Sequence, residues 1–268
     1  MHERPTILLP VGVLEGESIP EGVPGLLSKA HVVLLGYHVV PDQTATDQAR
    51  KQFQDQALRR LDDFTGMLED AGATVESTLV FTHDKQTTFD RISGEHDCLA
   101  VLIPNATRSI ENVLVAVRGV VGIDRFVELV SGLFAPDDGE PEASPVRSDD
   151  SSERSESLPV SITLYHVAGS DETDADVETL LDGIATRISE NGVPRDRIDL
   201  DISRGDDHQD QLVDATDDYD AVVMGESDPS VTTFLFGMTA DQIAKQFLGP
   251  VFVIQHEEPV SDDDLEIE

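Results

Sequence analysis

Hydrophobic positions along the chain follow two patterns: short, almost wholly apolar runs, and longer stretches with an apolar residue every three or four positions. The run from His31 to Val40 is of the first kind and is typical of a strand covered on both faces. The stretch from Phe53 to Ala71 is of the second kind and predicts a helix with one apolar stripe. We expect Thr46 or Asp47 to cap the start of this helix, and Gly72 to end it in the left-handed conformation.

The same alternation continues along the whole chain. Further strands are predicted at Thr6–Val11, Thr74–Phe81, Cys98–Ile103, Val113–Gly119, 159–167, 198–202, Ala221–Met224 and Val251–Gln255. Further helices are predicted near Leu26, near Phe89 and Ile92, and at Ile123–Val130, 174–191, 209–216 and Ala240–Phe247. Apolar strands that alternate with amphipathic helices predict an α/β fold with a parallel sheet and helices on both of its faces.

The chain also contains an internal repeat. The segment Leu34–Val39 returns as Ile162–Val167, 128 positions later, and both copies contain Tyr-His-Val. Further along each copy, Glu69–Gly72 is matched by Ser189–Gly192. A fixed order of matching segments indicates a duplicated domain.

The two copies are predicted to be unequal. Nine residues separate Ile103 from Val113, so the first copy (1–111) lacks room for a last helix and a fifth strand. The second copy (112–256) carries all five strands and an insert at about 136–157 rich in Asp, Glu, Ser and Pro, which we expect to be a disordered loop. Opening strands match at an offset of 106 and Tyr-His-Val strands at 128, and the insert accounts for the difference. An acidic tail, 257–268, is expected to be mobile.

Charge adds a second strong signal. The formal net charge is −36, from 54 Asp and Glu against 18 Lys and Arg, only 4 of them Lys. Such charge opposes compaction in dilute buffer, whereas at molar salt the Debye length is about 3 Å and the repulsion is screened. This favours a protein of a halophilic cytoplasm, with an ordinary acidic protein as the alternative. Nucleic acid is excluded as a partner, because its affinity comes from Lys and Arg.

No apolar run of membrane-spanning length is present, so direct membrane insertion is not expected. The single cysteine, Cys98, excludes a disulfide within the chain and is expected to be inert core. We therefore expect a soluble protein of the cytoplasm.

The segment from Ala221 to Ile254 resembles the end of a universal stress protein domain. It has an apolar strand ending in Gly225, a loop, a helix start near Gly237 and a Pro-Val strand opening at Pro250. The opening strands also resemble the first strand of that family. The resemblance implies tandem domains of the adenine nucleotide alpha hydrolase-like type, each an open parallel five-stranded sheet with helices on both faces, the first copy being truncated. The ligand it implies is ATP, because glycines let backbone amides approach phosphates.

The chain departs from the family's glycine pattern in both copies. The second copy keeps Gly225 and Gly237, but Asp228 replaces the middle glycine and Met238 replaces the hydroxyl residue, with Thr239 adjacent. The first copy has no glycine loop after its fourth strand. A degenerate nucleotide site is therefore expected in the second copy, formed by Arg118, Val167, Gly225, Gly237 and Thr239.

His38 and His166 occupy one place in the repeat, at the end of the second strand. They are either a metal pair or general base, or residues that pack and hydrogen-bond locally. No His-x-x-His spacing, nucleophile elbow or Walker loop is present, so we predict no metal site and no catalytic activity.

The function predicted from these features is a non-catalytic regulatory or interaction protein of the universal stress type. We expect a homodimer through strand 251–255 or an intramolecular pseudo-dimer, and a protein partner such as a transporter. The alternatives are an ATP-binding stress protein that uses the second copy, and an enzyme or electron-transfer subunit on the same fold.

Overall fold

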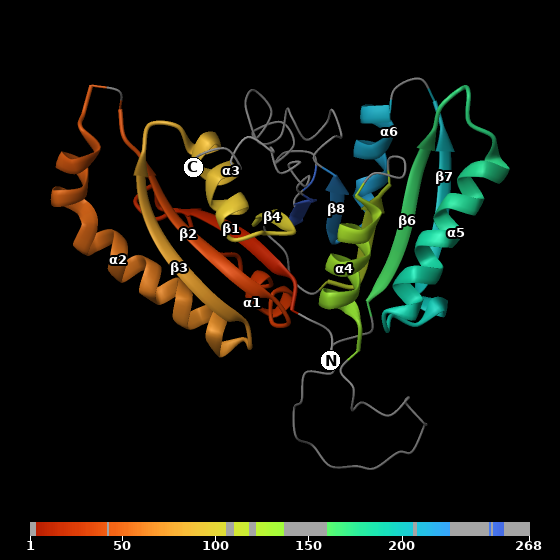
Figure 1. Ribbon diagram of the computed structural model, residues 1–268, viewed down its shortest axis with the longest axis horizontal. Coiled ribbons are helices and arrows are strands. Elements are labelled where there is room, and N and C mark those ends of the chain that lie inside the picture. Colours follow the sequence, from red (N-terminus) through yellow and green to blue (C-terminus); the bar gives the residue numbers. More distant parts are fainter. Residues whose placement is uncertain are drawn as a thin grey trace, which may run out of the picture.

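The computed structural model describes residues 4–41, 43–105, 110–117, 122–136, 160–205, 208–225, 247 and 249–254. Within these residues strands alternate with helices, as predicted, and the strands form one mostly parallel sheet (Figure 1). The acidic insert from residue 137 on, the predicted helix before Phe247 and the acidic tail lie outside the described residues.

The first half of the described chain contributes β1 (Thr6–Gly12), α1 (Val23–Leu26), β2 (His31–Val39), α2 (Thr46–Asp70), β3 (Thr74–Thr82), α3 (Lys85–Glu95) and β4 (Ala100–Ile103). The second half contributes β5 (Asn112–Ala116), α4 (Ile123–Phe134), β6 (Ser161–Ala168), α5 (Asp174–Glu190), β7 (Ile198–Arg204), α6 (His208–Ala215), β8 (Ala221–Gly225) and β9 (Val251–Ile254).

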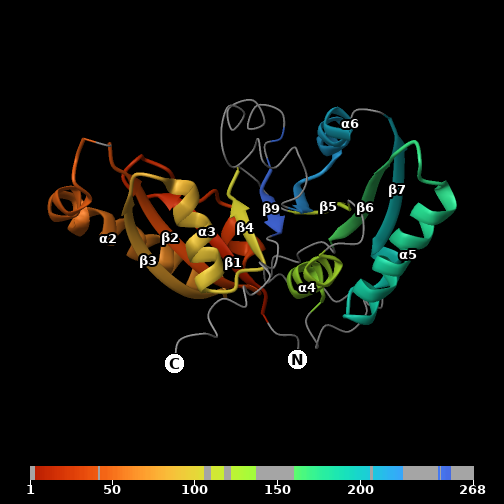
Figure 2. The same cartoon turned by 45° about the horizontal axis from the view of Figure 1, so that its top comes forward.

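The nine strands lie in the order β3-β2-β1-β4-β9-β8-β5-β6-β7. The order β3-β2-β1-β4 of the first half matches β7-β6-β5-β8 of the second, and β9 lies between them (Figure 2). β9 runs parallel to β8 and antiparallel to β4, with Ile103 opposite Val251. β9 therefore completes both halves: it is the fifth strand of the second and also pairs with β4 of the first, which would otherwise present unpaired backbone groups at an edge.

This pairing involves the strand through which a homodimer or an intramolecular pseudo-dimer was predicted. Both backbone edges of β9 are hydrogen-bonded within the chain, to β8 and to β4. A second copy therefore finds no free edge on residues 251–254, and the two halves of one chain are joined there instead.

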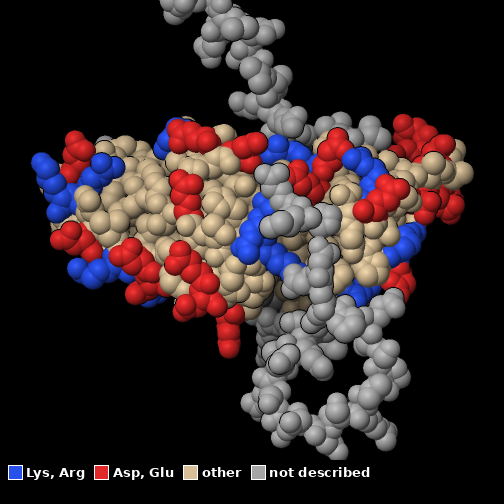
Figure 3. Space-filling model, turned by 60° about the horizontal axis from the view of Figure 1, so that its bottom comes forward, with Lys and Arg blue, Asp and Glu red and all other residues tan. Residues whose placement is uncertain are grey.

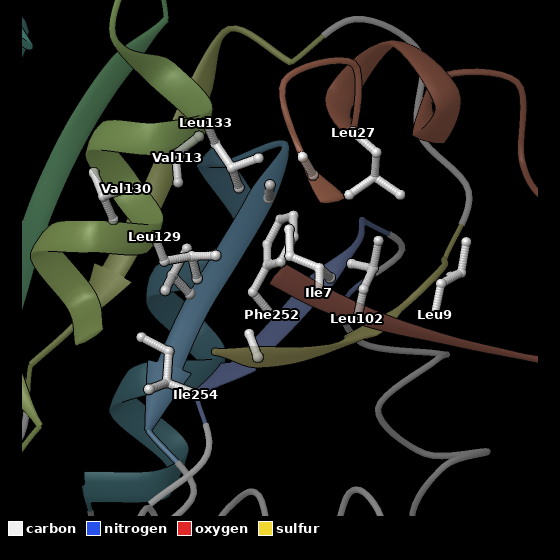
Figure 4. Packing of buried hydrophobic residues seen from close by; sticks show 14 of the residues in the cluster. Ile7, Leu9, Leu27, Leu102, Val113, Leu129, Val130, Leu133, Phe252 and Ile254 are labelled. Carbon is white, nitrogen blue, oxygen red and sulfur yellow. The ribbon is translucent and has the colours of Figure 1, made fainter. Parts of the chain in front are cut away.

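One hydrophobic cluster follows a single face of the sheet through both halves. It contains residues from all nine described strands and from α1, α2, α4 and α5. Phe252 is fully buried near its centre, with Ile7, Leu102 and Leu129 around it (Figure 4). On the opposite face the described core divides into two smaller clusters, one under α3 and one under α6. The halves are thus united on one face of the sheet.

Helix α4 belongs to the second half but also packs on the first. A Cβ atom at Gly132 would lie 2.7 Å from Cδ of Pro5, so the helix approaches the chain just before β1 closely. Lys29 donates from Nζ to the carbonyl of Ala135 at the end of α4, at 2.6 Å. Near the start of the helix, Arg125 donates to the carbonyl of Cys98, also at 2.6 Å.

The ends of α2 confirm one prediction and correct another. Gly72 has φ +108° and Gly192, which follows α5, has φ +99°, as the repeat predicts for residues that end helices. The predicted N-cap is wrong, because Thr46 and Asp47 already lie within the first turn of α2. The N-cap is Ala45, which makes no side-chain hydrogen bond.

The two halves differ in register on one side of their first strand. Ile7 pairs with Ala100 and Val113 with Ala221, which agrees with the offset of 106 between opening strands. Tyr37, however, pairs with Gly12, and Tyr165 pairs with Ala116, an offset of 104 (116 − 12). β6 is therefore shifted by two residues relative to β5, about 6.6 Å, which keeps the same side chains on each face.

Candidate functional site

Ligands of open parallel sheets bind at the carboxyl ends of the strands. Because β9 is antiparallel to β4, the strands of the two halves run in opposite directions across the junction. Each half therefore has its own carboxyl edge, and we describe the two edges separately.

At the carboxyl edge of the second half, three neighbouring strands reach the same level. Met224 of β8 pairs with Ala116 of β5, which pairs with Tyr165 of β6. One residue further along each strand are Gly225, Val117 and His166. The structure thus places Gly225 beside the end of β5, whereas Arg118, Gly237 and Thr239 lie outside the described residues.

Two predicted site residues can be placed. Val167 pairs with Ser203 of β7 and packs against the cluster under α6. A Cβ atom at Gly225 would lie 3.7 Å from the ring of Phe126, an ordinary contact. The described surroundings of Gly225 therefore do not themselves demand a glycine.

His166 is the most enclosed polar group at this edge. Its side chain is 4% exposed. Nδ1 lies 2.8 Å from the carbonyl oxygen of Val117, and Nε2 lies 3.2 Å from Oε2 of Glu172. The same Oε2 accepts the backbone N–H of Gly169 at 2.7 Å. His166 therefore joins the end of β5 to the loop that follows β6.

Arg204, at the end of β7, holds the same loop from the other side. Its guanidinium donates to the carbonyls of Gly169 and Glu172, at 3.4 and 3.1 Å. It also donates from Nε to Asp174 at the start of α5, at 2.9 Å. The loop between β6 and α5 is thus held by a histidine and an arginine from neighbouring strands.

The carboxyl edge of the first half is occupied by its own acidic loop. Glu17 accepts the backbone N–H of Gly12 at 2.6 Å, and Glu15 lies 2.7 Å from Nδ1 of His38. A Cβ atom at Gly12 would lie 2.8 Å from the Glu15 carboxylate and 2.9 Å from that of Glu17. The backbone donor at the end of β1 is therefore bonded to a carboxylate of the protein itself.

The carboxylates of Glu17 and Glu15 lie close enough to Tyr37 to affect its pKa. Its hydroxyl lies 3.4 Å from Oε1 of Glu17. Burial raises the pKa of Tyr37 well above its ordinary value, and the negative charges of Glu17 and Glu15 raise it further. An anionic ligand at this edge would meet the same repulsion.

The two histidines of the repeat therefore pack and hydrogen-bond locally, each within its own half. His38 and His166 each lie beside a glutamate of their own half, and their strands are separated in the sheet by five others. Within the described residues no group of three or more His, Cys, Asp or Glu side chains is arranged to hold a metal ion.

Sequence reasoning missed the residues that shape both edges, which are Glu15, Glu17, Glu172 and Arg204. The available signal was their position: Glu15 and Glu17 follow β1, Glu172 follows β6, and Arg204 ends β7. In a chain with 54 acidic residues that signal does not distinguish these glutamates from solvated ones.

Cys98 lies in the core, as predicted, with 1% of its surface exposed. Burial raises the pKa of its thiol to about 12. The thiolate is the reactive form, and a thiol with this pKa is little ionised near neutral pH.

Comparison with solved structures connects this architecture to a known fold. A universal stress protein from Archaeoglobus fulgidus DSM 4304 matches 94% of this chain and 97% of its own, with a TM-score of 0.60 and 15% identity. This chain has the universal stress protein fold. No protein-family model and no curated protein matches its sequence.

Two more distant structures are also similar. The cytoplasmic domain of a prokaryotic cation chloride cotransporter covers 95% of this chain and 96% of its own, with a TM-score of 0.46 and 10% identity. A universal stress protein in complex with cAMP covers 56% of this chain and all of its own, with a TM-score of 0.35 and 14% identity. We draw nothing further from these two, because neither TM-score reaches 0.5.

None of the helices in the described part of the chain combines the length and the apolar character that crossing a membrane requires.

Proposed function

We propose that this chain is a regulatory or interaction protein of the universal stress type, without catalytic activity, from a salt-rich cytoplasm. The observation that carries the proposal is the match along 94% of the chain to a universal stress protein, together with the strand order that appears in both halves. The acidic composition supports the salt-rich setting.

We further propose that any nucleotide binds only in the second half. In the first half Glu17 already accepts the Gly12 N–H, and Glu15 adds a second negative charge. In the second half the described carboxyl edge has Gly225 beside the end of β5, and the next residue along the chain from Val117 is Arg118. A guanidinium there would supply a charge-assisted bond to a phosphate.

We propose in addition that a further copy or a protein partner binds away from β9. Since β9 is used within the chain, the two halves take the place of a dimer, and a further copy or a protein partner such as a transporter would bind elsewhere.

Isothermal titration of ATP with Mg²⁺ into the full chain at molar KCl tests the nucleotide site. We expect sub-millimolar binding that Arg118→Ala weakens about tenfold, the loss expected for one charge-assisted hydrogen bond. Arg59→Ala, at an exposed position of α2 in the first half, removes the same charge as a matched control and should bind as the unaltered chain does.

Absence of heat up to millimolar ATP would remove nucleotide binding and leave the interaction role. Steady release of phosphate from ATP, abolished by Arg118→Ala, would instead contradict the non-catalytic assignment.

A further inference from the structure

We propose that His166 and Glu172 form a pH-dependent latch that closes the loop between β6 and α5 onto the end of β5. The latch consists of the Val117 carbonyl, the His166 ring and the Glu172 carboxylate, in that order. It needs no ligand, so it stands independently of the proposed function.

The proton positions follow from the partners of the ring. A carbonyl oxygen only accepts, so Nδ1 of His166 must carry a proton to bond Val117 at 2.8 Å. An ionised carboxylate also only accepts, so Nε2 must carry a second proton to bond Glu172 at 3.2 Å. Both bonds therefore exist together only when the ring is an imidazolium.

Loss of the Nε2 proton changes one side of this arrangement. The neutral ring keeps Nδ1–H on the Val117 carbonyl, which is backbone and cannot turn away, while the Nε2 lone pair then faces the carboxylate of a side chain that is 39% exposed and can turn. Two acceptors at this distance repel, so the Glu172 side chain turns away and the N–H of Gly169, which bonds the same oxygen, loses its partner. Imidazole is the side chain that changes its charge in the physiological range of pH.

The charged groups around the latch belong to the loop, to α5 and to β7. In the described neighbourhood they are Asp171 and Glu172 in the loop, Asp174 at the start of α5 and Arg204 at the end of β7. On β5 the facing group is a backbone carbonyl, and on β7 the residue paired with His166 is Ile202. Arg204 bonds the carbonyls of Gly169 and Glu172 whatever the state of the ring, so release loosens the loop without detaching it.

Among the described residues of the first half, His38 does not form the same arrangement. His38 is 22% exposed, against 4% for His166, and its glutamate partner comes from the loop after β1. That bond uses Nδ1 and does not involve the loop after β2. The latch is therefore specific to the half in which the end of β5 and Gly225 lie side by side.

The experiment follows two signals of the full chain at molar KCl, without nucleotide, between pH 5 and pH 9. Nitrogen NMR of the His166 ring reports which nitrogens carry protons, and amide exchange reports the protection factors of residues 169–173. We expect both ring nitrogens to be protonated at the acidic end, and the protection factors to fall roughly tenfold or more as Nε2 loses its proton.

Two substitutions distinguish the negative charge of Glu172 from its hydrogen bonds to Gly169 and His166. In Glu172→Gln the amide oxygen still accepts from Gly169 and from the ring but lacks the charge that holds an imidazolium, so release should move to lower pH. In Glu172→Ala the loop should be loose throughout. The Glu172 side chain is 39% exposed, so both chains should fold. Glu178→Gln, at an exposed position of α5, removes the same charge and should behave as the unaltered chain.

The proposal is overturned if the protection factors do not change as the ring titrates, or if Glu172→Gln releases the loop at the unaltered pH. Either result would leave nucleotide binding untouched, and a failure to bind ATP would leave the latch standing.

Discussion

At the scale of single residues, one glycine sets how closely the two halves approach. Gly132 lies in α4 with its α-carbon against the ring of Pro5, which precedes β1. Gly183, in α5, is also within a helix, but a Cβ atom there would have nothing within 4 Å. The same residue type therefore has a packing role at one position and none at the other.

We expect Gly132→Ala to destabilise the chain by about 1–3 kcal/mol, because the added methyl group forces α4 away from Pro5. Gly183→Ala, the matched control, should stabilise it by roughly 0.5–1 kcal/mol through helix propensity alone. Urea unfolding of both variants at molar KCl measures the difference. Equal effects at the two positions would show that α4 does not rest on the first half.

At the scale of elements, β9 is the strand on which both halves depend. It completes the strand order of each half, and Phe252 is the largest of its fully buried side chains. The hydrophobic cluster around Phe252 contains residues of β1 and β4 as well as β5 and β8. A destabilising substitution in β9 should therefore lower the stability of both halves.

We expect Phe252→Ala to lower the free energy of unfolding by about 3–5 kcal/mol, through lost burial and the cavity left behind. Met67→Ala, at a position of α2 that is 43% exposed, should change it by no more than about 0.5 kcal/mol. Unfolding in urea, followed by circular dichroism, should show one transition in each chain. Two transitions, one unaffected by Phe252→Ala, would mean that the halves unfold separately.

At the scale of the whole molecule, charge repulsion opposes a fold in which both halves share one sheet. Acidic side chains are spread over the surface with fewer basic ones among them (Figure 3). With a net charge of −36, acidic groups within about 10 Å of one another still repel at 0.1 M salt, whereas at molar salt the Debye length falls to about 3 Å. Screening by salt should favour the compact state.

We expect the Tm to rise by about 10 °C between 0.1 M and 2 M KCl, which for a chain of this size corresponds to roughly 3–5 kcal/mol. Differential scanning calorimetry measures it, and sucrose at matched water activity controls for effects other than screening. A Tm that stays level or falls with KCl would contradict salt adaptation.

The helices and strands could be predicted from the sequence, because each depends on neighbouring residues. The three- and four-residue spacing in α2, the apolar run of β2 and the helix-ending glycines Gly72 and Gly192 are all local signals. The shortness of the first half was equally visible, since only nine residues separate Ile103 from Val113.

The candidate site was predicted less completely. Gly225 and Val167 were placed on the correct strands, but the carboxylates that occupy the first edge and contact His166 at the second were not found. Whether Glu17 meets Gly12, or Glu172 meets His166, depends on loop paths that no period in the sequence describes.

By itself, then, the sequence determined which segments are strands and helices and that they occur twice. Only the tertiary structure decided that β9 serves both halves, that α4 packs on Pro5, and which acid each histidine meets. The physical reason is distance along the chain: Ile103 and Val251, which pair in the sheet, are 148 positions apart (251 − 103). Their pairing becomes favourable only once both halves have folded and two strand edges would otherwise remain unpaired.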